Sequence, residues 1–237
     1  MGLRDALDLP VAMDWGHLLF ANWPVDPDVV DAHLPAPLSV DTYDDEAWLS
    51  VVPFRNVAVR PEGLPAALGL HLPELNLRTY VTHGDHAGVY FFSLDADGLL
   101  GVVGARLFHH LPYYSADISI ETPEGGQRVA VWSRRTHPGA RPCDFVASYE
   151  PTGRQYRSEP GSLDAFLTER YRYYTETPDG ELRFAAVEHD RWPLYEVDVT
   201  LETNQVFEGN GFRTPDSEPR FLYSPGVDVI ASASRTP

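Results

Sequence analysis

Apolar and polar residues alternate along much of the chain, in short runs separated by proline, glycine and other turn-forming residues. Because the side chains of a β-strand point alternately to its two faces, this alternation is typical of strands. The stretches ELNLRTYVTH and GVYFFSLDA flank Gly84-Asp85, a pair that favours a hairpin turn. We expect strands over residues 17–25, 47–54, 55–61, 74–83, 88–96, 115–122, 127–135, 143–151, 181–189, 194–202 and 226–232.

Helical patterns are confined to three segments. Asp26 is suited to cap a short helix that Pro35 ends. Asp97 is suited to cap a second helix through GLLGVVGARLFHH. Ser162 is suited to cap a third helix over residues 163–174.

The spacing of these elements predicts the fold class. Many short strands, a Pro/Gly/Leu-rich loop over residues 61–73 and no regular β-α-β alternation argue against a doubly wound sheet. We expect a mainly β fold with a few helices, built as one domain over residues 1–237. A curved antiparallel sheet or β-barrel would account for its strand edges.

The charge of the chain narrows its partners. Eighteen basic residues stand against 35 acidic ones, a net charge of −17. This balance argues against nucleic acid and against an anionic membrane surface, and it indicates a halophilic protein. No apolar run reaches the ~20 residues of a membrane span, and the N-terminal pattern is not that of a signal peptide. We therefore expect a cytoplasmic protein.

Two residue types limit the chemistry. All 18 basic residues are arginine, so the chain has no lysine to form an imine with a substrate or with pyridoxal phosphate. Cys143 is the only cysteine, which excludes an intrachain disulfide and a multi-thiolate metal site. In its strand-like context Cys143 is expected to be a packed residue, and we expect neither a metal nor a cofactor.

The stretch ELNLRTYV places an unusual set of side chains on one face. Glu74, Asn76, Arg78 and Tyr80 share that face of the expected strand, and the odd-numbered positions 75–81 share the other. One interpretation is an ordinary solvent-facing surface. The other places the face in the lumen of a barrel, where the guanidinium needs an acid or an anionic ligand as its partner.

The histidines give weaker signals. His83 and His86, with Asp85 between them, could clip a metal, but a polar hairpin turn explains the spacing better. His189 precedes DRWPLYEV and is either a base in a pocket or a hydrogen-bonded residue at a strand end.

Several longer stretches, in this order, make the chain resemble the YqjF-like family of uncharacterised proteins. They are WPVDPDVVDAHLPAPLSVDTYDDEAWLSVVPF, ELNLRTYV, GVYFFSLDA, ARLFHHLPYYSADI, LTERYRYYT and HDRWPL. The family in turn is distantly similar to the acetoacetate decarboxylase-like superfamily. That resemblance implies a β-barrel or cone-like sheet around a central pocket, with a helix packed against it.

The resemblance also suggests matching positions. Glu74 matches the glutamate of the superfamily's first motif, and Arg106 loosely matches the arginine of its helix. Pro112 matches the proline that precedes the Schiff-base lysine, and Tyr113 stands where that lysine would be. A phenol cannot form an imine, so imine-dependent decarboxylation is not expected.

The remaining groups suit a small organic acid. Arg78 and Arg106 could hold its carboxylate, and Tyr80 and Tyr113 could donate hydrogen bonds to a carbonyl or enolate oxygen. Glu74 could act as general acid or base if burial raises its pKa.

Two further residues complete the candidate site, His189 as a second proton carrier and Asn76 as a ligand contact. The set suits proton transfer on a keto or hydroxy acid, in a lyase or isomerase. It equally suits a non-catalytic binding module. The third alternative, ranked behind these two, is a structural domain with a filled lumen. The structural alternative for Arg78 is an internal ion pair with Glu74. An exposed strand edge would permit a homo-oligomer.

Overall fold

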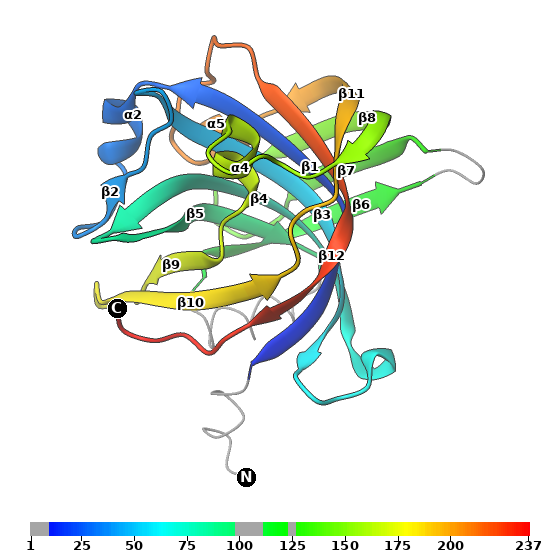
Figure 1. The fold of residues 1–237 in the computed structure, drawn as a ribbon, viewed down its shortest axis with the longest axis horizontal. Helices are drawn as coiled ribbons and strands as arrows, with labels where there is room; N and C mark the ends of the chain where they lie inside the picture. Colours follow the sequence, from blue (N-terminus) through cyan, green and yellow to red (C-terminus); the bar gives the residue numbers. More distant parts are fainter. Residues whose placement is uncertain (1–9, 98–110, 123–126) are drawn as a thin grey trace.

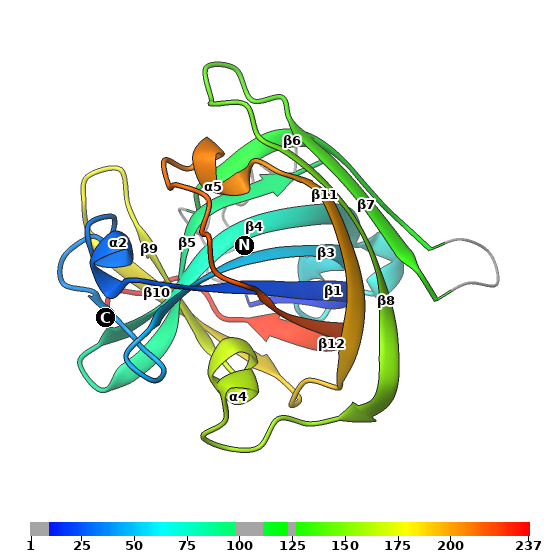
Figure 2. The ribbon, with the colours of Figure 1, turned by 90° about the horizontal axis from the view of Figure 1, so that it is seen from above.

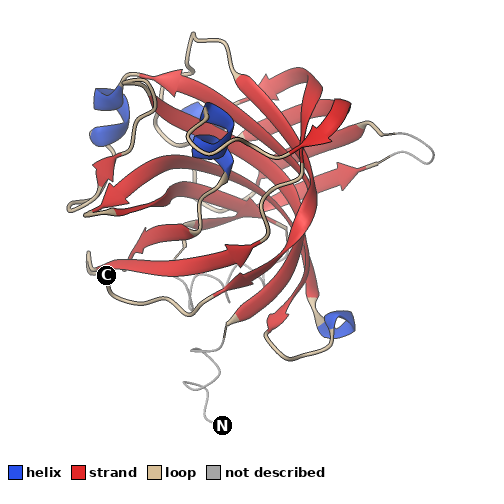
Figure 3. Cartoon of the chain, in the orientation of Figure 1, coloured by secondary structure: helices blue, strands red, loops and turns tan. Residues whose placement is uncertain are grey.

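The computed structural model describes residues 10–97, 111–122 and 127–237. Within them the chain forms a single, strongly curved β-sheet with a few short helices (Figure 1, Figure 3). The expected fold class, a mainly β curved sheet, is confirmed. Its strands are β1 (Val11–Val25), β2 (Ser39–Val40), β3 (Ala47–Pro61), β4 (Leu70–His83), β5 (His86–Ala96), β6 (Tyr113–Glu121), β7 (Val129–Arg135), β8 (Asp144–Tyr156), β9 (Arg172–Glu176), β10 (Leu182–His189), β11 (Leu194–Asn204) and β12 (Arg220–Ala231).

The strands form two closed rings that have five strands in common. The strand order of the sheet is β10-β9-β5-β6-β7-β8-β11-β12-β1-β3-β4-β2, with additional pairings β4–β5 and β10–β12. The strands β12, β1, β3, β4 and β5 therefore have β6, β7, β8 and β11 on one side and β9 and β10 on the other (Figure 2). Both faces of the shared strands are covered by this arrangement.

This double cover explains why β4 is buried on both faces. Its odd-numbered residues Leu75 and Leu77 are fully buried in the largest apolar cluster, with Phe145 and Tyr149 of β8. Its even-numbered residues face the side of β9 and β10, where Tyr80 packs in a second cluster. Alternate residues of β4 thus pack in two different clusters, one on each face of the strand.

The hairpin of β4 and β5 forms where the sequence predicts it. His83 pairs with His86, and Gly84 between them has a φ of +57°, a conformation that glycine adopts without strain. The strands are largely antiparallel, but the pairs β5–β6 and β5–β9 are parallel. β6 pairs with the C-terminal part of β5 and β9 with its N-terminal part, so the sheet divides at β5.

The helices are shorter than their patterns predict. The helix α2 (Pro27–Asp31) begins at the expected N-cap Asp26, whose side chain accepts a hydrogen bond from the amide of Asp28. Similarly, Ser162 caps α4 (Leu163–Thr168) by accepting from Ala165. Within the described residues, the other helical elements are α5 (Val206–Gly209) and the 3-10 turn η1 (Ala66–Leu68).

Two predictions about boundaries are wrong. The helix expected over 163–174 ends at Thr168, because the aromatic and β-branched residues of 172–176 join the sheet as β9. The loop expected over 61–73 is shortened by β4, which begins at Leu70. The helix expected after Asp97 lies outside the described residues. No helix in the described part of the chain is long and apolar enough to cross a membrane.

Candidate functional site

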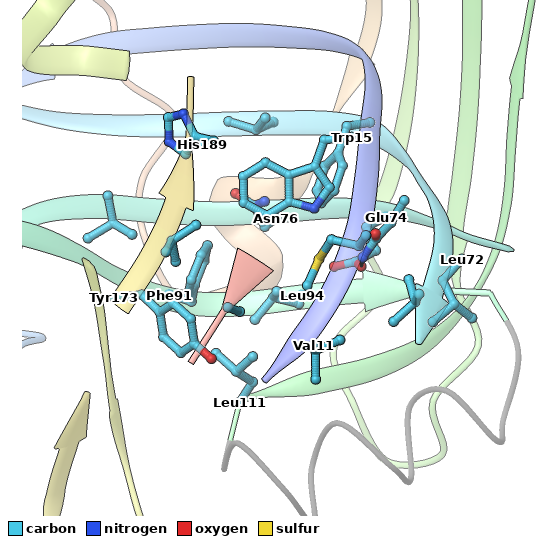
Figure 4. A pocket seen from close by; sticks show the side chains of 18 of the residues that line it. Val11, Trp15, Leu72, Glu74, Asn76, Phe91, Leu94, Leu111, Tyr173 and His189 are labelled. Atoms are coloured by element: carbon cyan, nitrogen blue, oxygen red, sulfur yellow. Dashed lines mark hydrogen bonds between the residues drawn. The ribbon is translucent and has the colours of Figure 1, made fainter. Parts of the chain in front are cut away.

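A cavity of about 410 Å³ lies between the shared strands and the layer of β9 and β10. The even-numbered residues of β4 from Leu70 to Arg78 all line it, together with residues of β1, β3, β5 and β10 (Figure 4). The face that carries Glu74, Asn76 and Arg78 therefore points into this cavity. Of the two interpretations of ELNLRTYV, the lumenal one is correct, and the solvent-facing one is wrong.

Glu74 is the only carboxyl group among the described residues that line the cavity. Its Oε1 accepts a hydrogen bond from Asn56 Nδ2 at 2.5 Å, and its Oε2 accepts one from the Tyr113 hydroxyl at 2.9 Å. Burial raises the pKa of Glu74 to about 7, although both hydrogen bonds act in the opposite direction. The group therefore changes charge close to neutral pH.

Tyr113 holds Glu74 in place. It stands at the start of β6, and its buried ring lines the cavity. Burial, and then the neighbouring charge of Glu74, raise the pKa of Tyr113 well above its usual value, so the phenol stays protonated and keeps donating. The sequence predicted a hydrogen bond from Tyr113 to the ligand, whereas the structure directs this hydroxyl to Glu74.

Arg78 carries a buried charge without an acidic partner. Arg78 is 9% exposed, and no carboxylate of the described residues lies within 4.0 Å of its guanidinium. Its Nη2 donates to the carbonyl oxygen of Leu167 at 3.2 Å, and its Cζ lies 5.4 Å from the ring centre of Phe20. The internal ion pair with Glu74, one of the alternatives, is not formed.

The cavity wall reverses the charge balance of the protein. Four arginines line it against the single carboxyl of Glu74, in a chain whose net charge is −17. Apart from Arg78, Arg170 pairs with an aspartate at 2.7 Å, Arg60 donates to backbone carbonyls, and Arg172 lies over an aromatic ring. A wall of this composition attracts anions.

Several polar atoms of the wall lack a hydrogen-bond partner. Seven buried side-chain nitrogen and oxygen atoms in the described part of the chain are without one. Four of them belong to residues that line this cavity: Trp15 Nε1, Asn56 Oδ1, Asn76 Oδ1 and Arg78 Nε. Because buried polar groups are nearly always paired, this concentration marks a place where polar groups of a ligand are accommodated.

His189 lies at one edge of the same cavity. Its ring stacks on Tyr171, with ring centres 4.7 Å apart, and its Nδ1 lies 2.8 Å from the carbonyl oxygen of Asp190. Burial lowers its pKa below the usual 6.5, so the imidazole is neutral at pH 7. The structure thus brings His189 to the cavity with Glu74 and Arg78.

Tyr80 is placed differently from its prediction. Its hydroxyl lies 2.8 Å from both the carbonyl oxygen of Leu167 and Ser50 Oγ, and Tyr80 is not among the residues that line the cavity. It therefore anchors the end of α4 rather than a ligand. Arg106, the other predicted carboxylate contact, lies outside the described residues.

Two other groups of candidate residues have structural surroundings. Cys143 is buried beside Asp95, and burial raises the pKa of its thiol to about 12, which fits the expected packed cysteine. Asp95 forms a buried ion pair with Arg135 at 2.7 Å that joins β5 to β7. His83 and His86 flank the hairpin turn, and no group of three or more metal-binding side chains occurs in the described residues.

Sequence reasoning missed several residues of the wall. Trp15 lies on β1, and Asn56 and Arg60 lie on β3. They reach the cavity because β1 pairs with β3 and β3 pairs with β4, which the sequence alone did not reveal. Arg172 belongs to β9, a strand predicted as helix. The alternation in RNVAVRP could have indicated Asn56. If this strand is paired with ELNLRTYV, the side chain of Asn56 lies beside Glu74.

Solved structures with the same fold are acetoacetate decarboxylase-like. An acetoacetate decarboxylase-like enzyme from Sphingomonas wittichii RW1 is similar over 96% of this chain and 92% of its own, with 19% identity and a TM-score of 0.65. The enduracididine biosynthesis enzyme MppR is similar over 95% and 88%, with 14% identity and a TM-score of 0.66. At these identities the likeness concerns the fold.

Sequence comparison gives a nearer relationship. The model of the family DUF2071, described as an uncharacterized conserved protein, matches residues 12–228. The uncharacterized protein YqjF of Bacillus subtilis (strain 168) is 41% identical over 217 residues, which cover 91% of this chain and 88% of YqjF. The expected resemblance is confirmed, and the chain belongs to the DUF2071 family of YqjF-like proteins, built on an acetoacetate decarboxylase-like fold.

Proposed function

We propose that the cavity binds a keto or hydroxy acid without a covalent bond, and that Glu74 exchanges a proton with it. Arg78 is proposed to hold the carboxylate of this acid, and the protein would then act as a lyase or isomerase. The observation that carries the proposal is the buried guanidinium of Arg78, which faces the cavity and has no carboxylate partner among the described residues.

The energetics of Arg78 support an anionic ligand. Burying a charge is unfavourable unless a partner of opposite charge compensates it, and its backbone contact with Leu167 is neutral. A carboxylate would supply charge-assisted hydrogen bonds, including one to the unpartnered Nε. The excess of arginine in the wall adds to this attraction.

The surroundings of Glu74 support a proton transfer. With a pKa of about 7, both the acid and the base form are present near neutral pH. In the proposed isomerisation, the carboxylate of Glu74 takes a proton from a carbon next to the carbonyl, whose oxygen receives the electron pair. The protonated Glu74 then returns the proton to another atom of the same substrate, so that charge and atoms balance.

Fold neighbours agree with this class of ligand. MppR, similar in fold, has been solved with pyruvate, a keto acid. Because this chain has no lysine, the proposed chemistry involves no imine. The acid would be held by charge and shape only.

A thermal-shift screen against keto, hydroxy and unsaturated acids of increasing length tests the binding site. We expect acids to raise the melting temperature of the wild type, Arg78→Gln to abolish the effect and Arg78→Lys to retain part of it. The matched control is Arg134→Gln, an exposed arginine on β7. Acids that stabilise Arg78→Gln as well as the wild type would contradict the assignment of Arg78.

Binding without turnover is the second candidate function. It is favoured by the hydrogen bonds that already occupy both carboxyl oxygens of Glu74. Proton exchange separates the two functions, since NMR in heavy water detects deuterium entering a bound acid. Exchange that the wild type catalyses and Glu74→Gln does not supports the enzyme. Stabilisation without any exchange supports the binding module.

A further inference from the structure

Of the charged residues that line the cavity, Glu74 and Arg78 lie far apart on the same strand. Glu74 and Arg78 are four residues apart on one face of β4, which separates their backbones by roughly 13 Å at about 3.3 Å per residue. A short keto acid is smaller than this separation. It can contact the guanidinium or the carboxyl group, but not both at once.

Hydrogen bonds hold the two head groups near their own positions along β4. Glu74 accepts from Asn56, which pairs with Leu72, a residue further from Arg78 along β4. Arg78 in turn donates to the carbonyl oxygen of Leu167, the same atom that accepts from the hydroxyl of Tyr80. Arg78 is thus held toward Tyr80, while Asn56 and Tyr113 hold Glu74 near its own position. We therefore take the backbone separation as the separation of the two head groups.

Figure 4 shows the same division. His189 lies on one side of the cavity and Glu74 on the other, with Asn76 and Trp15 between them. Arg78 belongs to the His189 side, because it donates to the carbonyl oxygen of Leu167. The next carbonyl, that of Thr168, accepts from Trp192, whose ring centre lies 4.9 Å from that of His189. We call the part of the cavity at Arg78 the cationic end and the part at Glu74 the carboxyl end. Arg60 of β3 also lines the carboxyl end, where backbone carbonyl oxygens already accept from its guanidinium.

The wall between the ends is mainly apolar. Leu94 of β5, which pairs with Asn76, lines the middle, Phe91 follows toward Arg78, and Trp15 covers the middle from β1. Asn76 is the polar exception on β4, with its unpartnered Oδ1. Such a wall favours a hydrocarbon chain or a ring over a second charged group.

From these positions we infer that the ligand is an elongated monocarboxylic acid, with its carboxylate at Arg78, an apolar body and a second oxygen group near Glu74. This inference rests on the proposed function and specifies its substrate class. Allowing about 3 Å for a contact at each end leaves roughly 7 Å between the two polar groups of the ligand. An extended chain advances about 3.5 Å in three bonds, so about six bonds separate them.

The volume of the cavity agrees with this length. At roughly 30 Å³ for each water-sized group, 410 Å³ holds about fourteen non-hydrogen atoms. A hydroxylated eight-carbon acid, with about eleven such atoms, fits within this volume. Pyruvate would leave most of the apolar wall without contact.

Calorimetric titration with acetate, butanoate, hexanoate, octanoate and dodecanoate tests the inference. We expect affinity to rise about fourfold for each methylene up to the eight-carbon acid, because each buried methylene adds apolar contact. Dodecanoate should bind more weakly than octanoate. A hydroxyl group on the ligand that reaches Glu74 should strengthen binding. We therefore expect 7-hydroxyoctanoate to bind about tenfold more tightly than octanoate.

A variant at the carboxyl end tests the orientation of the ligand. Leu72→Trp adds bulk beside Glu74, so it should shift the optimum to a shorter acid and leave butanoate unaffected. The matched control is Leu201→Trp on β11, which is exposed and does not line the cavity. An optimum that stays at the same length in Leu72→Trp would overturn the proposed orientation.

The outcomes separate this inference from the proposed function. If all acids bind with equal affinity and all depend on Arg78, the proposed function stands and the elongated ligand is wrong. If affinity rises with chain length but Arg78→Gln binds the acids as tightly as the wild type, the apolar body of the ligand is supported. The assignment of its carboxylate to Arg78 is then wrong. If no acid binds the wild type, both are wrong.

Discussion

Replacement of Glu74 by glutamine is expected to stabilise the protein in a manner that depends on pH. Burial raises the pKa of Glu74 from its ordinary 4.5 to about 7. Between these values the folded protein retains the proton and the unfolded chain has lost it. Stability therefore falls as pH rises through this range, and the contribution present below pH 4.5 is lost once the pH passes 7.

The size of this loss follows from the two pKa values. The difference of about 2.5 corresponds to about 3 kcal/mol, because one pKa unit is worth 1.36 kcal/mol. Glutamine has nearly the same shape and carries no charge at any pH. Relative to the wild type, Glu74→Gln should therefore gain about 3 kcal/mol of unfolding free energy between about pH 4.5 and pH 8.

Urea unfolding, followed by tryptophan fluorescence at several pH values, measures this gain directly. Salt at about 1 M keeps surface charges screened, with a Debye length of about 3 Å. Glu202→Gln, at an exposed position of β11, is the control and should show no comparable pH dependence. A difference between Glu74→Gln and the wild type that stays constant with pH would refute the raised pKa.

Three further predictions concern neighbouring groups and the surface. Tyr113→Phe removes a hydrogen bond that lowers the pKa of Glu74, so the loss of stability should extend to higher pH in the same urea series. Arg135→Met leaves Asp95 buried without its partner and should lower the unfolding free energy by about 3–5 kcal/mol, much of which the added Asp95→Leu should restore. Finally, the net charge of −17 predicts a lower melting temperature in about 0.1 M than in about 1 M salt, measured calorimetrically.

Each of these has a contrary outcome. An unchanged pH profile in Tyr113→Phe would show that the phenol does not act on Glu74. A double variant no more stable than Arg135→Met would show that the loss comes from packing rather than from the unpaired Asp95. A melting temperature that is equal or higher in dilute buffer would exclude the halophilic interpretation.

The sequence predicted most of the strands and the shared face of β4 because both depend on local alternation. Glu74, Asn76 and Arg78 had to lie together, whatever the rest of the fold. Whether their face met solvent or a cavity depended on β9 and β10, which cover it from more than ninety residues further along the chain. The local pattern of β4 does not reveal whether distant strands cover this face. The sequence was therefore compatible with both the solvent-facing and the cavity-facing interpretation.

The errors have the same origin. Tyr80 continues the polar face by its position, but α4 lies over it and its hydroxyl binds Leu167. The residues 172–176 follow a helix start and contain arginine and tyrosine, which both helices and strands accept. Pairing with β10 decided in favour of a strand. Propensity alone could not choose between these states.

The two faces of β4 also have a consequence for how such a protein can change over generations. Its odd positions, such as Leu75 and Leu77, hold the larger apolar cluster, while its even positions from Leu72 to Arg78 meet only the cavity side. Substitutions at even positions leave that cluster untouched, and their effects should add to those of changes across the sheet. Descendants of one ancestor can thus acquire different ligands while inheriting an unchanged scaffold.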